Sequence, residues 1–140
     1  MASSLPNQKR IALVAHEHKN PLLLAWAKRH REQLLQHKLC ADGTTGSLLQ
    51  QQSNLPTTRL LSGPLGGDQQ TGALIATEKL TLLVFFWDPL TSQPHDLDVK
   101  ALLRLAVVWD IPMACGTTTA DFLFSSKLLG QDYLRHPSLP

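Results

Sequence analysis

The sequence is poor in cysteine: it has two, Cys40 and Cys115, and they form no Cys-x-x-Cys pair. Both lie in short apolar segments that read as strands. A disulfide framework and a cysteine-rich zinc site are therefore disfavoured, and buried free thiols in a reducing compartment are the better interpretation. We accordingly expect a cytoplasmic protein.

An excess of one charge is also missing, because 13 Lys and Arg stand against 11 Asp and Glu, a formal charge of +2. This is too small to indicate a nucleic-acid partner, and the densest basic segment, Lys28–Arg31, lies in a helical pattern and reads as a solvated face. The longest apolar run, Leu82–Trp87, is far shorter than the roughly 20 residues of a membrane-spanning helix. We expect neither a nucleic-acid nor a membrane partner.

What the chain does contain is a regular alternation of apolar strand-like runs with amphipathic helical patterns. This alternation predicts a parallel sheet with helices on both faces, a three-layer α/β/α fold of the flavodoxin or Rossmann-like kind. The predicted domain covers residues 9–124, preceded by a disordered leader over 1–8 and followed by a short tail over 125–140 without a clear element. Strands are expected at 11–15, 38–41, 57–61, 80–87 and 111–114, and helices at 20–36, 47–53, 69–78, 96–107 and 117–124. Asn20, followed by a proline, is expected to be the N-cap of the first helix.

A glycine-rich loop, Ser62-Gly-Pro-Leu-Gly-Gly-Asp-Gln-Gln70, separates the third strand from a helix. Such a loop lets backbone N–H groups approach an anionic ligand, and the carboxylate of Asp68 at its end could act as a general base. Plain turn geometry is the alternative explanation of the glycines.

Ligands of open α/β sheets bind beyond the carboxyl ends of the strands. Nearly all reactive side chains outside the predicted helices follow a strand, which favours a polar site at this edge of the sheet. The segments concerned are 16–18, 42–45, 62–68, 88–95 and 115–119.

The segment Gly43-Thr-Thr-Gly46 opens a helix and offers backbone donors and hydroxyls to a phosphate, although it lacks the lysine of a P-loop. A threonine cap between glycine turns is equally compatible with it.

His16 and His18 supply only two of the three or four ligands that zinc needs, so we expect no metal. His95, ahead of Asp96 and Asp98, is either an imidazole that stabilises an oxyanion or a surface histidine beside a helix cap formed by one of these aspartates. Trp87 is a possible wall of the site.

Several motifs together resemble the methylglyoxal synthase family, in order and with matching spacing from about Lys9 to Phe124. They are His16-Glu-His18, Gly43-Thr-Thr-Gly46, the 62–70 loop, Phe85-Phe-Trp-Asp-Pro-Leu90, Pro94-His-Asp-Leu-Asp-Val-Lys-Ala-Leu-Leu-Arg-Leu105 and Thr119-Ala-Asp-Phe122. The resemblance implies a five-stranded parallel sheet and a homohexamer. It also implies conversion of dihydroxyacetone phosphate into methylglyoxal and inorganic phosphate, without a metal or organic cofactor and with inorganic phosphate as a possible regulator.

The resemblance further implies roles by matching position. Asp68 would remove a proton from the hydroxyl-bearing carbon, and His95 would bind the substrate oxygens and shuttle protons. His16 would contact the substrate, and the phosphate would be held by Gly43, Thr44, Thr45, Ser62 and Gly63. Glu17, Asp88 and Asp98 would support the site.

The sequence departs from the family pattern at the phosphate pocket. Asp42 stands where members usually carry threonine, and Asn20 stands where they carry a phosphate-binding lysine; Lys19 could substitute if the turn shifts. Both exchanges predict weaker phosphate binding. They also suit a rival function, a non-catalytic module that senses phosphate or another small molecule, whereas the retained Asp68 and His95 favour the enzyme. The resemblance also implies a longer C-terminal segment than residues 125–140 provide.

Overall fold

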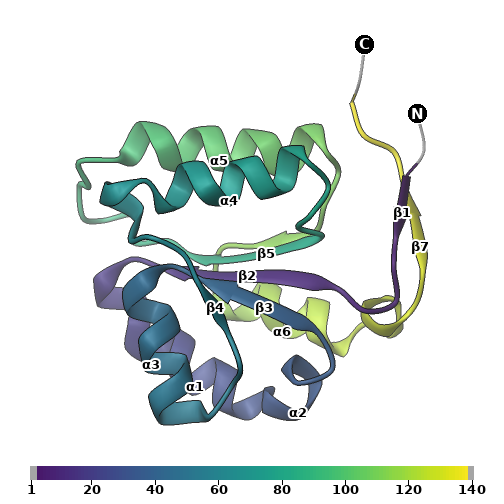
Figure 1. Cartoon of the computed structure of the whole chain (residues 1–140), viewed down its shortest axis with the longest axis horizontal. Helices are drawn as coiled ribbons and strands as arrows, with labels where there is room; N and C mark the ends of the chain where they lie inside the picture. Colours follow the sequence, from purple (N-terminus) through teal and green to yellow (C-terminus); the bar gives the residue numbers. More distant parts are fainter. Residues whose placement is uncertain (1–2, 139–140) are drawn as a thin grey trace.

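A five-stranded parallel sheet runs through the middle of the molecule in the computed structural model, which describes residues 3–138 (Figure 1). The strands lie side by side in the order β4-β3-β2-β5-β6. This confirms the predicted fold class. Their bounds are β2 (Arg10–Ala15), β3 (Lys38–Ala41), β4 (Thr58–Arg59), β5 (Leu82–Phe86) and β6 (Met113–Ala114).

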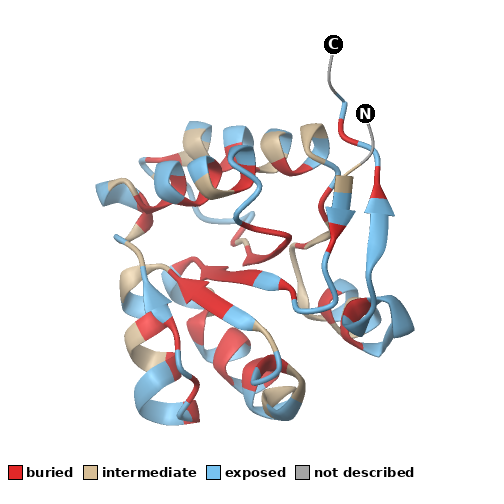
Figure 2. Ribbon diagram, turned by 45° about the vertical axis from the view of Figure 1, so that its right-hand side comes forward, coloured by how far each residue is buried: buried red, intermediate tan, exposed pale blue. Residues whose placement is uncertain are grey.

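Helices cover both faces of the sheet, and the alternating side chains of β2 explain why. Ile11 and Leu13 belong to the core beneath one face, whereas Ala12 and Val14 belong to the core beneath the other. The strands are accordingly the most continuously buried part of the chain (Figure 2). One face carries α4 (Gly67–Ala76) and α5 (Asp96–Val108); the other carries α1 (Asn20–Arg29), α2 (Arg31–Leu34), α3 (Gly43–Ser53) and α6 (Thr117–Ser125).

The order of the strands creates a crevice between β2 and β5. From β2 the chain moves outward through β3 to β4, then returns to place β5 on the opposite side of β2. At such a switch point the connections leave the two neighbouring strands in opposite directions, which opens a ligand-sized gap beyond their carboxyl ends. Residues that follow β2 and β5 therefore face one another.

The two ends of the chain differ from the prediction. The expected disordered leader contains β1 (Ser3–Leu5), which pairs antiparallel with β7 (Tyr133–Arg135) in the tail, and η3 (Lys127–Gly130) precedes β7. Leu5 is buried in the core, so this pairing is anchored rather than peripheral. Residues 1–2 of the leader and 139–140 of the tail lie outside the described part of the chain.

Two details of the predicted helices were also wrong. The helix expected over 20–36 is interrupted at His30, whose ring is held by Gln33 and Asp121. His95, not an aspartate, precedes the first residue of α5, and no side chain caps that helix. Among residues 3–138, no helix combines the length and the apolar character needed to span a bilayer.

Candidate active site

A cleft of about 340 Å³ lies beyond the carboxyl ends of the strands, where the switch point places it. It joins residues that follow β2, β3, β4 and β5, as the strand-end argument predicted. Segment 115–119 after β6, which the same argument included, does not line it. Most of the predicted site residues line it: the lining consists of Ala15, His16, Glu17, Asn20, Asp42, Thr44, Ser62, Gly63, Pro64, Gln93 and His95.

Asp68 is not itself a lining residue of this cleft; it lies next to Gly63 and His95, which are. Oδ2 of Asp68 is 3.7 Å from Nε2 of His95, and both side chains are almost completely buried. Burial raises the pKa of the Asp68 carboxyl, an effect that the imidazole of His95 partly opposes. Oδ2 has no hydrogen-bond partner among the described residues. A carboxylate with a raised pKa and a free oxygen is suited to accept a proton.

Gly67 allows the 62–70 loop to fold tightly enough to place Asp68. A Cβ atom on Gly67 would lie 1.9 Å from the carbonyl oxygen of Leu61, so no other residue fits there without moving the backbone. The loop itself contains η2 (Gly63–Leu65), and α4 begins at Gly67. Asp68 thus stands in the first turn of α4, where the positive end of the helix dipole favours its ionised form.

Gly63 lines the cleft next to the Asp68 and His95 pair. A Cβ at this position would lie 2.9 Å from Nε2 of His95 and 3.4 Å from Oδ2 of Asp68. The bare backbone is therefore needed for the two side chains to keep their positions.

His16 is held as a neutral imidazole with a defined tautomer. The backbone N–H of Asp88 donates to Nδ1 of His16 at 3.0 Å, so the ring proton resides on Nε2. Burial, and secondly the nearby His95, lower the pKa of His16. The two imidazoles meet edge to face with their centroids 5.6 Å apart. Nε2 of His16 is buried without a partner among residues 3–138, and it lies where a ligand oxygen could accept its proton.

Asn20 lines the cleft and is hydrogen-bonded to Thr45, which does not line it. The Thr45 hydroxyl donates to Oδ1 of Asn20 at 2.8 Å, and both residues are buried. Asn20 was predicted as a helix cap, but it is the first residue of α1, with Lys19 preceding it and no side-chain cap. This bond explains the difference, because the Asn20 side chain faces α3 instead of its own helix. Lys19 does not line the cleft.

Asp42 precedes α3 and lines the cleft with its carboxyl group. Burial raises the pKa of this carboxyl to about 6; the Thr45 hydroxyl opposes the effect and Asp68 adds to it. The backbone N–H groups of the first turn of α3, which begins at Gly43, have no partner within their helix and form an anion-binding end beside it. Gly43 itself lines an adjoining groove with Thr44 and Ser62.

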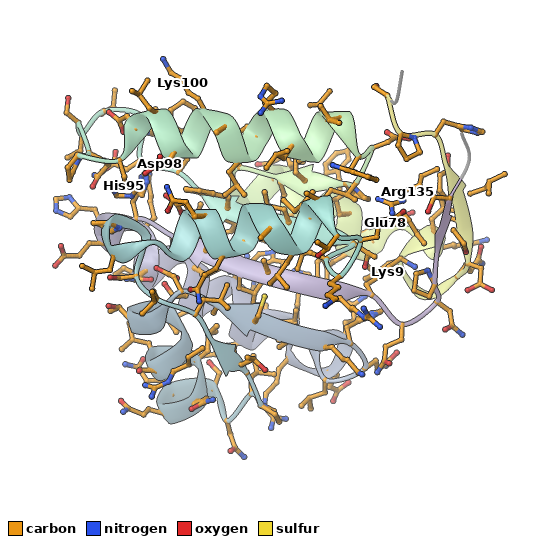
Figure 3. The ribbon with its side chains drawn as sticks, turned by 45° about the horizontal axis from the view of Figure 1, so that its top comes forward. Lys9, Glu78, His95, Asp98, Lys100 and Arg135 are labelled. Carbon is orange, nitrogen blue, oxygen red and sulfur yellow. The ribbon has the colours of Figure 1, made fainter. Side chains whose placement is uncertain are left out.

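The supporting residues divide into three cases. Glu17 lines the cleft and is exposed. Asp88 acts through its backbone N–H, while its carboxyl faces His18, 4.0 Å from Nδ1. Asp98 lines a separate hollow between α4 and α5, and Asp68 lines the same hollow (Figure 3 shows Asp98 beside His95 at the start of α5).

Sequence reasoning missed Gln93 and Pro64 as lining residues, although both lie within segments that follow a strand. Trp87, proposed as a wall, packs instead against the core beneath α4 and α5. In the described part of the chain no cluster of three or more His, Cys, Asp or Glu side chains has the geometry to hold a metal ion.

Comparison with known proteins agrees with the motifs. The family model of the MGS-like domain matches residues 22–115. The methylglyoxal synthase of Pseudoalteromonas atlantica is 62% identical over 86% of this chain and 90% of its own length, and that of Proteus mirabilis is 57% identical over 92% and 85%. The crystal structure of methylglyoxal synthase from Elizabethkingia anophelis superposes with a TM-score of 0.93 at 47% identity, covering 98% of this chain and 90% of that one. The chain belongs to the methylglyoxal synthase family.

Proposed function

We propose that this chain is a lyase that converts dihydroxyacetone phosphate into methylglyoxal and inorganic phosphate. The observation that carries the proposal is the pair formed by Asp68 and His95 at the cleft, with Oδ2 and Nε2 3.7 Å apart. A buried carboxylate with a raised pKa, next to an imidazole and an anion-binding helix end, provides both the base and the oxyanion donor that the reaction requires. Identity of 62% to a named methylglyoxal synthase supports the same reaction.

In this proposal Asp68 removes a proton from the hydroxyl-bearing carbon of the substrate. The resulting enediolate is stabilised by hydrogen bonds from His95 and from Nε2–H of His16, which is the only N–H group of the neutral ring. Because the pKa of Asp68 is raised, the carboxyl can hold the abstracted proton. Loss of phosphate leaves the enol of methylglyoxal, which becomes methylglyoxal when its methylene carbon takes up a proton and its hydroxyl group loses one.

The phosphate group leaves in the second step. Its C–O bond breaks when it lies perpendicular to the enediolate plane, because the electron pair of the enediolate then overlaps with the bond being broken. Backbone donors and hydroxyls at Gly43, Thr44, Thr45, Ser62 and Gly63 would fix that torsion by holding the phosphate. The groups that bind the substrate would be supported by Glu17, Asp88 and Asp98. Of these, Asp88 positions His16 through its backbone N–H.

We also propose the location, the cofactor requirement, the assembly and the regulation of this enzyme. We infer a cytoplasmic enzyme without an organic cofactor, and a homo-oligomer, a hexamer by family resemblance, with inorganic phosphate as product and regulator. Exposed apolar side chains support association between copies: Leu65, Leu90 and Leu97 are 72%, 94% and 81% exposed. Native mass measurement gives the number of copies directly.

The direct test is to incubate the purified protein with dihydroxyacetone phosphate and to measure methylglyoxal and phosphate. Equal amounts of the two products support the proposal. Phosphate released without methylglyoxal would indicate hydrolysis instead, and no consumption at saturating substrate would overturn the lyase function.

One observation favours a second candidate function, a phosphate-sensing module without turnover. No Lys or Arg lines the cleft within residues 3–138, and Asp42 adds a carboxyl to it. Calorimetry with inorganic phosphate beside the activity assay separates the two functions, since a sensor binds the anion but releases no methylglyoxal.

A further inference from the structure

Asp42 occupies the position that normally caps a helix, yet it does not cap α3. An aspartate there usually accepts a hydrogen bond from the second or third backbone N–H of the helix. In this structure its side chain accepts none, and only its backbone carbonyl is used, by the N–H of Gly46 at 2.7 Å. The carboxyl lines the cleft instead, and its Oδ1 is buried with no partner among the described residues.

The neighbouring hydroxyl cannot satisfy an ionised Asp42 carboxylate. The one hydroxyl proton of Thr45 is already donated to Oδ1 of Asn20. The Asp42 Oδ1 atom is therefore desolvated without a hydrogen bond that compensates for its burial among the described residues. Burial outweighs the opposing effect of the Thr45 hydroxyl and raises the pKa of Asp42 to about 6, which favours the carboxylic acid.

Other titratable groups face Asp42 from every side of the cleft. Asp68 from α4 raises the pKa of Asp42, and His95 at the start of α5 lowers it. His16 and Glu17 come from the segment after β2 and line the same cleft. His16 is held neutral by the N–H of Asp88, so it brings no positive charge to offset a second anion.

A phosphate bound at the first turn of α3 would meet this carboxyl. A phosphate monoester has a second pKa of about 6, close to that of Asp42. The two groups thus compete for protons over the same pH range, and two adjacent anions in a partly desolvated cleft repel each other unless one holds a proton.

We propose that Asp42 makes phosphate binding in this cleft conditional on one additional proton, which is held between the Asp42 carboxyl and the nearest phosphate oxygen. The proposal rests on the proposed function, because it takes the phosphate to bind at α3. The proton comes from solvent when the ligand binds and returns to solvent when it leaves. The site consequently takes up a monoanionic phosphate, or a dianion with a protonated Asp42, and rejects the dianion beside a carboxylate.

Sulfate is the sharpest probe, because it stays a dianion over the whole working pH range and any bound proton must then reside on the protein. Sulfate and inorganic phosphate are titrated by calorimetry from pH 5.5 to 8.5, each in two buffers with different ionisation enthalpies. In the wild-type protein we expect sulfate affinity to fall about tenfold for each pH unit above 6, with uptake of about one proton per sulfate at pH 8.

Variants of Asp42 show whether the pH dependence of sulfate binding comes from this carboxyl or from the histidines of the cleft. Asp42→Asn keeps the shape of the side chain, and Asp42→Thr provides a second neutral replacement if the first does not fold. We expect either variant to bind sulfate at pH 8 about 100-fold more tightly than wild type and to lose the additional proton uptake. Glu17→Gln removes a carboxylate from the same cleft and should keep the wild-type pH dependence.

The outcomes distinguish the two proposals. Equal pH dependence in wild type and Asp42→Asn, with methylglyoxal production intact, would overturn the role of Asp42 and leave the proposed function standing. The predicted difference without any turnover would support the role of Asp42 and remove the lyase function. Absence of anion binding in all proteins at every pH would overturn both.

Discussion

The backbone N–H of Asp88 donates to Nδ1 of His16 across 3.0 Å and so determines which ring nitrogen carries the proton. The two residues follow β2 and β5, the strands that flank the crevice, so the bond also joins the two sides of the switch point. Phe85 packs edge-on against the same ring, with centroids 5.2 Å apart, and limits its rotation. The ring presents one N–H to the cleft in one orientation.

Replacing His16 by Asn or by Gln separates the hydrogen bond that Nδ1 accepts from Asp88 from the hydrogen bond that Nε2 donates to the substrate. The amide oxygen of Asn stands near the place of Nδ1 and can accept from Asp88, whereas the amide nitrogen of Gln stands near the place of Nε2. We expect His16→Asn to keep the stability of the protein but to lose roughly tenfold or more in kcat/KM, because the donor to the substrate is gone. His16→Gln should lose about 1–2 kcal/mol of unfolding free energy, since the Asp88 N–H is left unpaired. Urea denaturation and steady-state kinetics of both variants check this, and the reverse pattern would contradict the assigned tautomer.

His16 should also titrate below the usual histidine range. Burial lowers its pKa, and a proton on Nδ1 would oppose the Asp88 N–H. A group whose pKa is lower in the folded state binds fewer protons than in the unfolded chain, so the folded state loses stability as the pH falls below about 6.5. Nitrogen-15 NMR should show the Nε2–H tautomer at pH 7. A His16 signal that titrates at or above 6.5 would refute the prediction.

Gly63→Ala tests how closely the backbone must approach the catalytic pair. The added methyl group would lie 2.9 Å from Nε2 of His95, so the imidazole has to move away from Asp68. We expect kcat to fall by roughly 100-fold, because displacements of about 1 Å at a reacting group have effects of that size. Gly130→Ala is the control, since its Cβ would meet nothing within 4 Å and its activity should be unchanged. Wild-type turnover in Gly63→Ala would argue against a role for the Asp68 and His95 geometry.

Asp68→Asn keeps the size of the side chain and removes the proposed base. The expected result is a roughly thousandfold lower kcat with phosphate affinity changed only a few-fold, because the phosphate grip does not include this carboxyl. Asp132→Asn, an exposed aspartate of the tail, is the control and should behave as wild type. Near-normal turnover in Asp68→Asn would assign the base elsewhere.

The sequence predicted those parts of the molecule that local patterns determine. The apolar runs and the helical periodicity between them sufficed for the parallel sheet, and the strand-end rule placed His16, Asp42, Ser62 and His95 at one cleft before the fold was known. The motif resemblance added the roles of Asp68 and its neighbours; those roles, and the domain limits at 9 and 124, stay predictions.

What could not be predicted depends on contacts that leave no local signal. Asp88 positions His16 through its backbone N–H, which every residue except proline carries, so the residue type gives no indication of it. The helix breaks at His30, whose ring is bound by Asp121 about 90 residues later, a contact that the local sequence does not indicate. The leader was expected to be disordered and the tail to have no clear element, because Ser3–Leu5 is too short to show a period and its partner β7 lies some 130 residues away.

Arg135 of β7 connects the paired ends of the chain to the rest of the fold. Its side chain is 2% exposed and donates to the carbonyl of Trp109 and to Glu78, each at 2.8 Å, and to Ser3 Oγ at 3.3 Å. Figure 3 shows Arg135 and Glu78 at the opposite end of the molecule from His95. We expect Arg135→Met to lose about 2–4 kcal/mol of unfolding free energy, because the bonds to β1 and to the end of α5 are lost while the stem is kept.

Activity at 25 °C should be unchanged in this variant, since no cleft residue contacts Arg135. Arg104→Met provides the control, because Arg104 is an exposed arginine of α5 and should change stability by less than about 0.5 kcal/mol. Urea denaturation of the two variants beside the wild type measures the difference. Equal unfolding free energies of all three proteins would mean that the pairing of β1 with β7 contributes nothing to stability. The prediction of a disordered leader would then be favoured over an ordered β1.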